Sequence, residues 1–414
     1  MDCPSNAVNG QTIHGVPLPN ELWTHAIGYL SSKQDLARIC LVSSLFNAIA
    51  IPFLYHTVDI RITKKEEWIK QQRFLINLSS PRFSDLVTRF DASISCIYRR
   101  RHGRPHLCDA NDKDLGRAIK AFKNLKTLRF RCDLCQASGR HLYLLNDLPT
   151  RTLKEFGFSC NCTNARNTDN SIFGSNSLPT APHMQTVTSL SLHCSDSWLI
   201  GANGTIHNVL QRNDALPLLK LWCYEEDHLL GSVGFPDEFL ISRPITRFYY
   251  KGELWTFEER IKYCAKLDCL LIDHRGTEFI MLVIRHPGAF ANLKHLGVLC
   301  LPSCNEDSVL EELGPLTNLK LLNTIEIERT IVDEGSLAYI MGPHDVFNPS
   351  QSLLQRLKEE HHSLCRLNVV NVFHTYAYLQ GSTLWEWRPD GTWAGRAIPD
   401  LSRWEVLNGG LDSV

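Results

Sequence analysis

The sequence predicts an α/β protein in which a short module of three helices precedes a long solenoid of repeated units and a closing hairpin. Three observations predict it: short helical patterns near the N-terminus, an apolar template that recurs down the chain, and a strong turn signal near the C-terminus. The chain has 414 residues, more than the ~250–300 at which a single compact core stops growing. We expect a disordered leader at 1–15, the helical module at 16–54, the solenoid at 55–380 and a C-terminal cap at 381–414.

Composition excludes several classes of function. Charged residues make up 21% and the formal net charge is −1, so no global field favours nucleic acid or a membrane surface. The first twenty residues lack the basic and apolar segments of a signal peptide, and no apolar run approaches the ~20 residues of a membrane-spanning helix. Fifteen cysteines in such a chain indicate reduced thiols. We therefore expect a protein of the cytoplasm, the nucleus or both.

The N-terminal module shows apolar residues at steps of three and four, the spacing of one helix face. The first helical pattern carries Leu22, Ala26 or Ile27, and Leu30, and the second, which follows the capping residue Ser32, carries Leu36. Helices this short are unstable alone and must pack on each other. About 40 residues leave apolar surface uncovered, which predicts a protein partner.

The third helical pattern follows a serine cap at Ser43 or Ser44. Pro52 is expected to disrupt or restart this helix, because proline has no N–H and its ring crowds the preceding turn.

The module also contains one motif with a specific spacing: Leu18-Pro19-Asn20-Glu21-Leu22, Ile27, Leu30, Asp35-Leu36, Cys40-Leu41-Val42-Ser43, Phe46 and Ile49-Ala50. Over about 45 residues it resembles the F-box, particularly in its fungal form, with Phe46 where many F-boxes have tryptophan. The resemblance implies docking onto a Skp-type adaptor of a cullin–RING ubiquitin ligase. The adaptor-binding candidates that it implies are Leu18, Pro19, Leu22, Ile27, Leu30, Leu36 and Val42. The alternative is a helical cap that shields the first edge of the solenoid.

The solenoid is predicted from the template apolar-x-x-apolar-x-apolar. Its occurrences begin at residues 55, 87, 125, 153, 187, 218, 245, 267, 293, 322 and 364. Most steps lie near the 20–29-residue period of leucine-rich repeats, and longer steps imply insertions. Each unit offers a short strand and a return segment, so the sequence predicts an irregular leucine-rich-repeat-like solenoid, a right-handed arc. Helical return segments are expected at 64–78, 114–122, 257–267 and 352–360.

The C-terminal region breaks the repeat pattern. Apolar residues alternate around Pro389-Asp390-Gly391, which predicts a β-hairpin that caps the last repeat. We expect four tryptophans to pack there: Trp385, Trp387, Trp393 and Trp404.

The cysteines raise a zinc alternative, because four thiolates can hold zinc tetrahedrally. The residues concerned are Cys132, Cys135, Cys160 and Cys162. A recurring small apolar side chain explains part of this set without metal, since one repeat position is shared by Cys132, Cys160, Cys194 and Cys300. We also find no nucleophile elbow and no phosphate loop, so we expect no enzyme, cofactor or metal.

A target-binding surface is predicted from the alternation of side chains along each strand. Residues three, five and seven of each template are expected to face the exposed inner surface. This predicts an aromatic and basic patch, a composition enriched in binding hot spots, at Lys220, Trp222, Tyr224, Arg247, Tyr249 and Lys251. Two alternatives remain: a loop covers the aromatic side chains, or the register is off by one residue and turns them inward.

Together these features predict a substrate-recognition subunit of an SCF-type cullin–RING ubiquitin ligase. Its partners would be a Skp-type adaptor, through it a cullin, and a target protein held by the solenoid, with no nucleic acid or membrane. The alternative is a scaffold or tethering protein outside a ligase that binds proteins through its repeats.

Overall fold

The structure is a computed structural model. It describes residues 19–30, 32–62, 65–95, 107–133, 152–161, 182–194, 216–226, 237–251, 258, 261–274, 282–283, 285–300, 313–314, 316–325, 351–373, 378–398, 401 and 403–411. The segment predicted to be a disordered leader lies outside these residues. Within the described ranges, every helix falls short of the length and hydrophobicity that a bilayer crossing requires.

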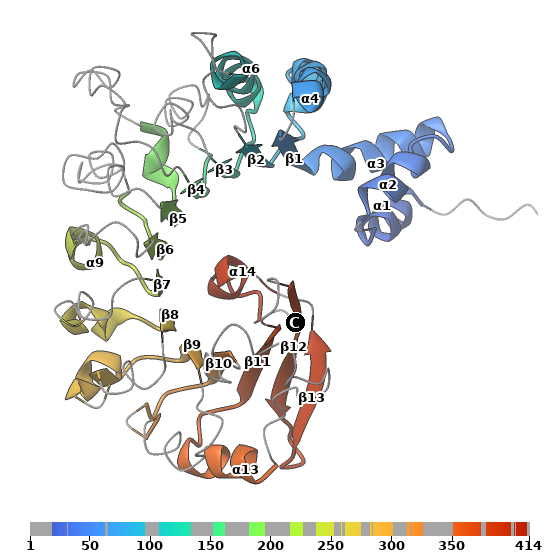
Figure 1. Ribbon diagram of the computed structural model, residues 1–414. Coiled ribbons are helices and arrows are strands. Elements are labelled where there is room, and N and C mark those ends of the chain that lie inside the picture. Colours follow the sequence, from blue (N-terminus) through green and yellow to red (C-terminus); the bar gives the residue numbers. More distant parts are fainter. Residues whose placement is uncertain are drawn as a thin grey trace, which may run out of the picture.

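Three helices form the N-terminal module: α1 (Asn20–Gly28), α2 (Lys33–Ile39) and α3 (Ser44–His56). The Ser32 side chain accepts a hydrogen bond from the Asp35 N–H, and the Ser43 side chain accepts one from the Phe46 N–H. These bonds satisfy amide groups that a helix start otherwise leaves unpaired. Figure 1 shows the module projecting from the first strand at one end of the molecule.

The prediction that Pro52 disrupts the third helix is wrong, because α3 continues through it to His56. Proline removes one hydrogen bond of the helix ladder, but the next residues compensate by packing. Phe53 and Leu54 lie against the buried core of the module, so the last turn of α3 is held by tertiary contacts.

In the described parts of the chain, thirteen strands form one sheet in chain order, so each strand pairs with the next. Strands β1 to β11 run parallel, and β12 and β13 are antiparallel additions. The strands are β1 (Thr57–Ile62), β2 (Arg89–Ser95), β3 (Thr127–Asp133), β4 (Glu155–Asn161), β5 (Ser189–Cys194), β6 (Leu221–Glu226), β7 (Arg247–Lys251), β8 (Cys269–His274), β9 (His295–Cys300), β10 (Leu321–Ile325), β11 (Arg366–Phe373), β12 (Tyr378–Trp387) and β13 (Trp393–Ile398).

The sheet curves into an arc with the return segments on its outside (Figure 1). These include α4 (Lys65–Leu78), α5 (Pro81–Ser84), α6 (Leu107–Ala121), α9 (Asp237–Ser242) and α13 (Gln351–Glu360), with 3₁₀ turns η4 (Pro182–Thr186), η6 (Ile261–Lys266) and η7 (Pro287–Phe290). Helices therefore occur where three of the four return helices were predicted. The fourth, expected at 257–267, contains the short 3₁₀ turn η6. The predicted α/β solenoid is confirmed as the fold class.

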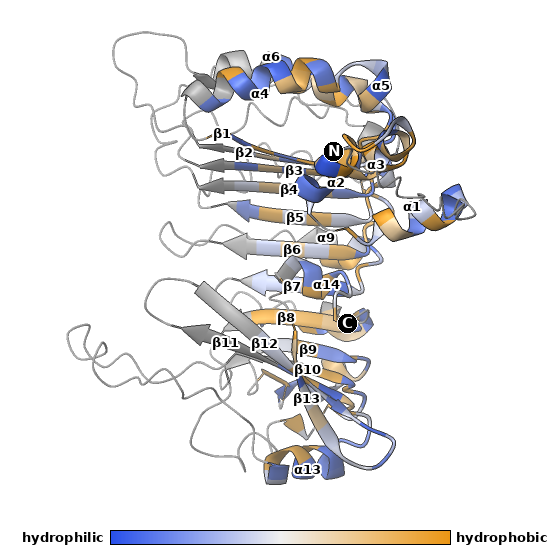
Figure 2. Cartoon of the chain, turned by 90° about the vertical axis from the view of Figure 1, so that its right-hand side faces the viewer, coloured by the Kyte–Doolittle hydropathy of each residue, from blue (hydrophilic) through white to orange (hydrophobic). Residues whose placement is uncertain are grey.

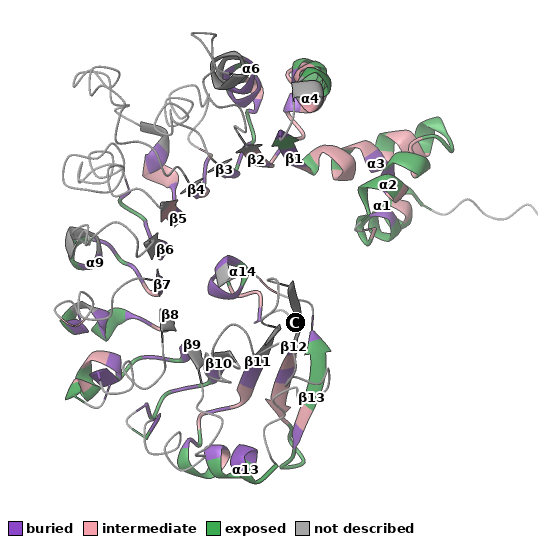
Figure 3. Cartoon of the chain, in the orientation of Figure 1, coloured by how far each residue is buried: buried purple, intermediate pink, exposed green. Residues whose placement is uncertain are grey.

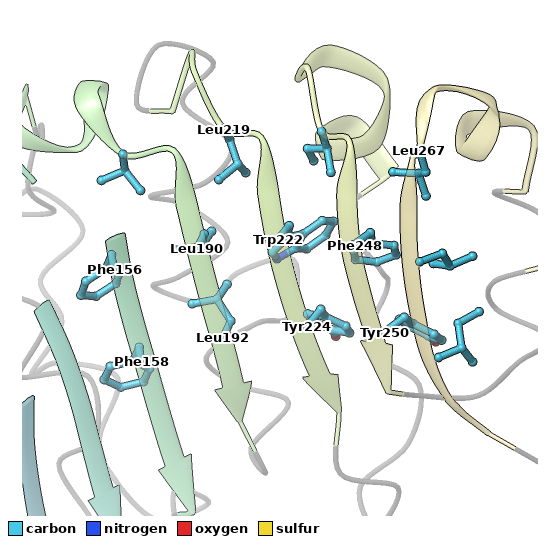
Figure 4. Packing of buried hydrophobic residues seen from close by; sticks show 14 of the residues in the cluster. Phe156, Phe158, Leu190, Leu192, Leu219, Trp222, Tyr224, Phe248, Tyr250 and Leu267 are labelled. Carbon is cyan, nitrogen blue, oxygen red and sulfur yellow. The ribbon is translucent and has the colours of Figure 1, made fainter. Parts of the chain in front are cut away.

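A continuous hydrophobic core fills the space between the sheet and the outer return segments. Equivalent side chains of neighbouring strands stack in rows, as Figure 4 shows for Leu190, Trp222 and Phe248. The Trp222 and Phe248 ring centroids lie 5.1 Å apart, and the Tyr224 and Tyr250 rings are stacked at 6.1 Å. Each repeat thus buries its apolar residues against its neighbours.

A backbone frame links the repeats. The carbonyl of the residue before each strand from β2 to β10 accepts two N–H groups of the next repeat; the Thr88 carbonyl, for example, accepts from Lys126 and Thr127. Side chains add a second bond at the outer turn. The donor residue lies one position before the first apolar residue of the template, and its side chain donates to a carbonyl of the preceding repeat. The donors are Asn124, Thr152, Thr186, Asn292 and Asn318.

The register of two predicted repeats is wrong. Trp222 pairs with Leu190 and Phe248, so the repeat around β6 begins at Leu219, one residue later than predicted. The repeat around β10 begins at Leu319, three residues earlier than predicted, because Leu322 pairs with Leu296 and Leu367. Leu219 and Leu319 are both fully buried, as the first template position requires.

The C-terminal hairpin consists of β12 and β13, joined by a turn in which Gly391 has a φ of 80°. Trp387 and Trp393 meet edge to face, with ring centroids 5.7 Å apart. The fourth tryptophan, Trp404, does not join them there. It belongs to the short helix α14 (Arg403–Leu407) and packs on the inner, concave side of the sheet.

Candidate functional site

The N-terminal module exposes large apolar side chains that its own core does not cover. The exposed fractions are 52% for Leu22, 75% for Tyr29, 86% for Leu41, 66% for Val42 and 42% for Leu45. Three of these residues lie at the corner between α2 and α3, within five positions of one another. Exposed apolar residues gathered in this way on a small module are typical of a surface that binds another protein.

The structure divides the residues predicted to bind an adaptor into two groups. Pro19, Leu22 and Val42 are exposed. Ile27 and Leu36 are only 4% exposed and form the core of the module, so they support the surface rather than lie on it.

Leu30 and Leu18 are the remaining two predicted residues. Leu30 is half-buried against the same core, and Leu18 lies outside the described residues. Sequence reasoning missed Tyr29, Leu41 and Leu45. Leu41 and Leu45 flank the serine cap of α3, with Leu41 in the turn after α2 and Leu45 in the first turn of α3, and apolar residues on both sides of a cap could have identified them.

Polar contacts hold the α2–α3 corner in shape. The Asn47 side-chain amide donates to the Cys40 carbonyl at 3.0 Å, which ties the start of α3 to the end of α2. The Phe46 ring meets the Trp23 ring edge to face at 5.0 Å, so Phe46 fills the aromatic position of the third helix. The exposed residues of the corner therefore sit on a fixed backbone.

The predicted aromatic and basic patch does not form on the inner face. Trp222 and Tyr224 are fully buried and point to the outer side of the sheet, among the core residues in Figure 4. The one-residue register error on β6 is the reason, since it exchanges the two faces of the strand. Tyr249 does lie on the inner side, but it too is fully buried.

The cationic members of that patch are distributed differently. Lys220, the residue before β6, is exposed, and Arg247 is half-buried on the inner row of β7. The side chain of Lys251 lies outside the described residues.

Helix α14 covers the inner face over β6 to β8. Leu221, Tyr249 and Leu271 form a second hydrophobic cluster with Val406 and Leu407. The Arg366 guanidinium donates to the Leu411 carbonyl at 2.8 Å and so anchors the segment after the helix. Figure 3 shows α14 inside the arc and largely buried, and Figure 2 shows β8, which it contacts, as hydrophobic along its length.

The inner face over β1 to β5 is polar and open. A pocket of about 550 Å³ lies on it, with Trp404 of α14 among the residues that line it. The polar side chains of its lining are Asp59, Arg61, Asp91, Ser93, Arg129, Arg131, Ser159 and Ser191. Positions three, five and seven of the correctly predicted templates include these residues on β1 to β3, so the alternation rule could have found them.

Arg129 is central to this pocket. Its guanidinium carbon lies 5.3 Å from the centre of the Trp404 ring, and one of its nitrogens lies 3.5 Å from the Glu155 carboxylate. Burial lowers the pKa of Arg129, and the neighbouring charge of Arg89 lowers it further, against the opposing effects of Asp91 and Glu155. The pocket therefore holds a partly desolvated positive charge.

The structure describes only the backbone of some of the cysteines that raise the zinc alternative. Cys132, Cys160 and Cys194 are in register on β3 to β5, as expected for one repeat position. Their side chains, and residues Cys135 and Cys162, lie outside the described parts of the structure.

Residues 17–61 match the family model described as F-box-like. The chain carries an F-box-like domain. A long, mostly parallel sheet follows it. No curated protein matches the chain.

The F-box-like domain joins the solenoid without a linker, because α3 ends at His56 and β1 begins at Thr57. The Thr88 N–H donates to the His56 carbonyl at 3.0 Å, and the side chains of the two residues are 2.8 Å apart. The Lys33 ammonium of α2 donates to the Thr57 carbonyl. Burial lowers the pKa of Lys33, whereas Asp59 and Asp91 of the solenoid raise it. These contacts fix the direction in which the domain points.

Proposed function

We propose that this protein recruits a target protein to a cullin–RING ubiquitin ligase. Its F-box-like domain would hold a Skp-type adaptor, and through it a cullin. Its solenoid, of the leucine-rich-repeat type, would hold the target. The observation that supports this best is the exposed apolar surface at Leu22, Leu41, Val42 and Leu45, on the domain that matches the F-box-like model.

Such a subunit needs no catalytic residue, because holding two reactants together raises the rate of reaction between them. A fixed orientation adds to this effect, and the junction through His56, Thr57 and Thr88 supplies one. Action in the cytoplasm or nucleus fits the cysteines, since Cys40, Cys223, Cys264, Cys269 and Cys365 are free thiols within the described residues.

Co-purification with a Skp-type adaptor tests this function. We expect a stable complex with the wild-type chain and at least a tenfold weaker one with Leu22→Asp, Val42→Asp, because a carboxylate in an apolar interface loses its water without gaining a partner. The matched control is Ile69→Asp, Ile241→Asp, which places the same change at exposed apolar residues of the solenoid. Its complex should equal that of wild type.

The outcome distinguishes the ligase subunit from a scaffold. If the wild-type chain folds, as judged by circular dichroism and its thermal transition, but binds no adaptor, the ligase function is wrong. The N-terminal helices would then act as a solenoid cap, and the protein as a scaffold that binds others through its repeats.

A further inference from the structure

We propose that the outer face of the first two repeats, formed by α4 and α6, binds an acidic amphipathic helix of another protein. The partner helix would supply carboxylates that meet exposed lysine and arginine side chains, and apolar residues that meet two exposed isoleucines. This inference goes beyond the proposed function and holds whether or not the chain joins a ligase.

Positive charge is concentrated in one segment of a nearly neutral chain. Residues 63–126 contain fifteen Lys and Arg and seven Asp and Glu, whereas the whole chain contains 43 and 44. The segment therefore has a formal net charge of +8, and the rest of the chain has −9. Residues 96–106 lie outside the described parts of the structure and are not part of the candidate surface; without them the segment still holds eleven Lys and Arg against seven Asp and Glu. A basic region in such a chain attracts partners of the opposite charge.

The described side chains of the outer elements show the same excess. On α4, α5, α6 and the turn before β3, seven cations accompany three carboxylates, and each carboxylate is already engaged. Asp114 pairs with Arg117 at 3.2 Å, and Asp85 lies 3.6 Å from Lys123. Glu67 is half-buried and has an interaction partner as well. All seven cations are exposed: Lys70, Arg73, Arg82, Arg117, Lys120, Lys123 and Lys126.

Three of these cations are available to a partner. Among the described residues, Lys70, Arg73 and Lys120 take part in no ion pair. The two helices that carry them lie side by side outside the sheet, as Figures 1 and 2 show. The Gln72 side-chain amide of α4 donates to the Asp114 carboxylate of α6 at 2.7 Å, so the cations of both helices are presented on one fixed support.

Exposed apolar side chains lie beside these cations. Ile69 is 50% exposed and Ile76 is 49% exposed. Arg73 lies between them at steps of four and three residues, so the three side chains share one face of α4, which is largely exposed in Figure 3. The two isoleucines are two turns apart, about 10 Å along the helix axis. Apolar residues two turns apart on a partner helix would therefore meet both of them.

The arrangement favours a protein over a nucleic acid or a membrane. A phosphate backbone would cover the two isoleucines without giving them an apolar contact. A bilayer would have to bury the charge of Arg73, because that residue lies between Ile69 and Ile76 rather than on a separate polar face. An acidic amphipathic helix supplies carboxylates and apolar side chains together.

A set of labelled helical peptides tests this inference. Each has ~18 residues and is stapled, because a free helix of that length is only marginally stable. The first peptide carries a stripe of leucines flanked by glutamates; the second replaces every glutamate by glutamine, and the third replaces every leucine by serine. In fluorescence anisotropy with the full-length protein, we expect the first peptide to bind at least tenfold more tightly than either of the others. Added salt should weaken that binding, since it screens exposed charges.

Charge variants of the protein locate the binding face. Arg73→Gln, Lys120→Gln should weaken binding of the glutamate–leucine peptide at least tenfold. The matched control Lys294→Gln, Lys320→Gln removes two exposed lysines from other repeats and should bind as wild type does.

Apolar variants test the contribution of the isoleucines. Ile69→Ser, Ile76→Ser should weaken binding of the same peptide severalfold. The matched control Leu218→Ser, Ile241→Ser changes two residues of other repeats that are 50% and 54% exposed, and it should retain binding.

Several results would overturn the proposal. These are equal binding of the three peptides, binding of none, or unchanged binding in Arg73→Gln, Lys120→Gln. Tighter binding of a double-stranded oligonucleotide, or of vesicles of phosphatidylserine and phosphatidylcholine, would replace the protein partner by a nucleic acid or a membrane. Self-association of the wild-type chain in sedimentation, abolished in the same variant, would make a second copy the occupant. Adaptor co-purification with all these variants should equal wild type, so a failure of this face and a failure of the ligase function are distinguishable.

Discussion

The concave face has two halves that share one backbone frame and differ in what covers them. Over β1 to β5 the inner rows carry charged and hydroxyl side chains, and a pocket lies open. Over β6 to β8 the equivalent positions carry the half-buried Arg247 and the buried Leu221, Cys223, Tyr249, Cys269 and Leu271, and α14 closes over this face. Carbonyl acceptors repeat without interruption through both halves. The frame therefore sets the shape, while side chains at two or three positions per strand decide whether the face is core or surface.

Because of this difference, helix α14 near the C-terminus contributes to the polar pocket as well as to the apolar half. The helix that completes the apolar half also places Trp404 at the edge of the polar half, against Arg129. Residues at the two ends of the solenoid thus build one surface, although they are far apart in the sequence.

The largest expected effect is the loss of the cover over the apolar half. Leu407 is fully buried, and Leu407→Ala should lower the free energy of unfolding by ~3 kcal/mol, the cost of removing a buried leucine side chain and leaving a cavity. Urea unfolding measures the loss. Hydrogen exchange should then show faster exchange in β6 to β8 and little change in β1 to β3. The control Leu218→Ala alters a half-exposed leucine and should cost less than 0.5 kcal/mol.

Equal acceleration of exchange in both halves would contradict this comparison. It would show that α14 stabilises the whole arc rather than the strands that it covers.

The same difference explains where sequence reasoning succeeded and failed on the fold. On β1 to β5 one face is apolar and the other polar, so alternation identifies the register. On β6 both faces are buried, and Leu218, Leu221 and Cys223 fit the template as well as the true residues do. On β10, Leu321 and Leu322 create a similar ambiguity. Asn318, which precedes Leu319 and donates to the preceding repeat, was the signal that could have resolved it.

The rule for finding inward-facing residues was correct, but it was used to choose residues on the wrong strands. The rule that template positions three, five and seven face inward is correct for Asp59, Asp91 and Arg129, yet the aromatic residues of β6 and β7 were preferred for their composition. The cover by α14 could not be read from local pattern, because it depends on a contact between Trp404 and strands far earlier in the chain. The burial of Ile27 and Leu36 depends likewise on how three short helices pack.

A pH change should loosen the solenoid at β9, the strand that borders the apolar half. His295 of β9 is 6% exposed, and burial, with a smaller effect of Arg247, lowers its pKa to about 3 from an ordinary value of 6.5. Between those pH values the unfolded chain takes up a proton that the folded chain does not, so stability falls by about 1.4 kcal/mol per pH unit as the pH decreases. From pH 6.5 to pH 5 this amounts to about 2 kcal/mol.

Urea unfolding of wild type and His295→Asn at the two pH values measures this contribution, which the variant should lack. The same change at exposed His362 should leave the wild-type difference intact. His361, whose pKa burial also lowers, contributes in all three proteins and cancels in the comparison. An equal pH dependence of wild type and His295→Asn would show that the folded protein accommodates a charged His295.

The smallest expected effect concerns the frame that both halves share. Asn124 donates to the Asp85 carbonyl at 2.7 Å under the polar half, and Asn318 donates to the Ala291 carbonyl at 2.6 Å between the repeats of β9 and β10, directly beyond the apolar half. Because the bonds are equivalent, Asn124→Ala and Asn318→Ala should each cost about 1 kcal/mol in urea unfolding. Lys294→Ala, whose backbone alone joins the frame, should cost less. A cost at Asn318 but none at Asn124 would mean that the cover over one half, and not a common frame, holds the repeats in register.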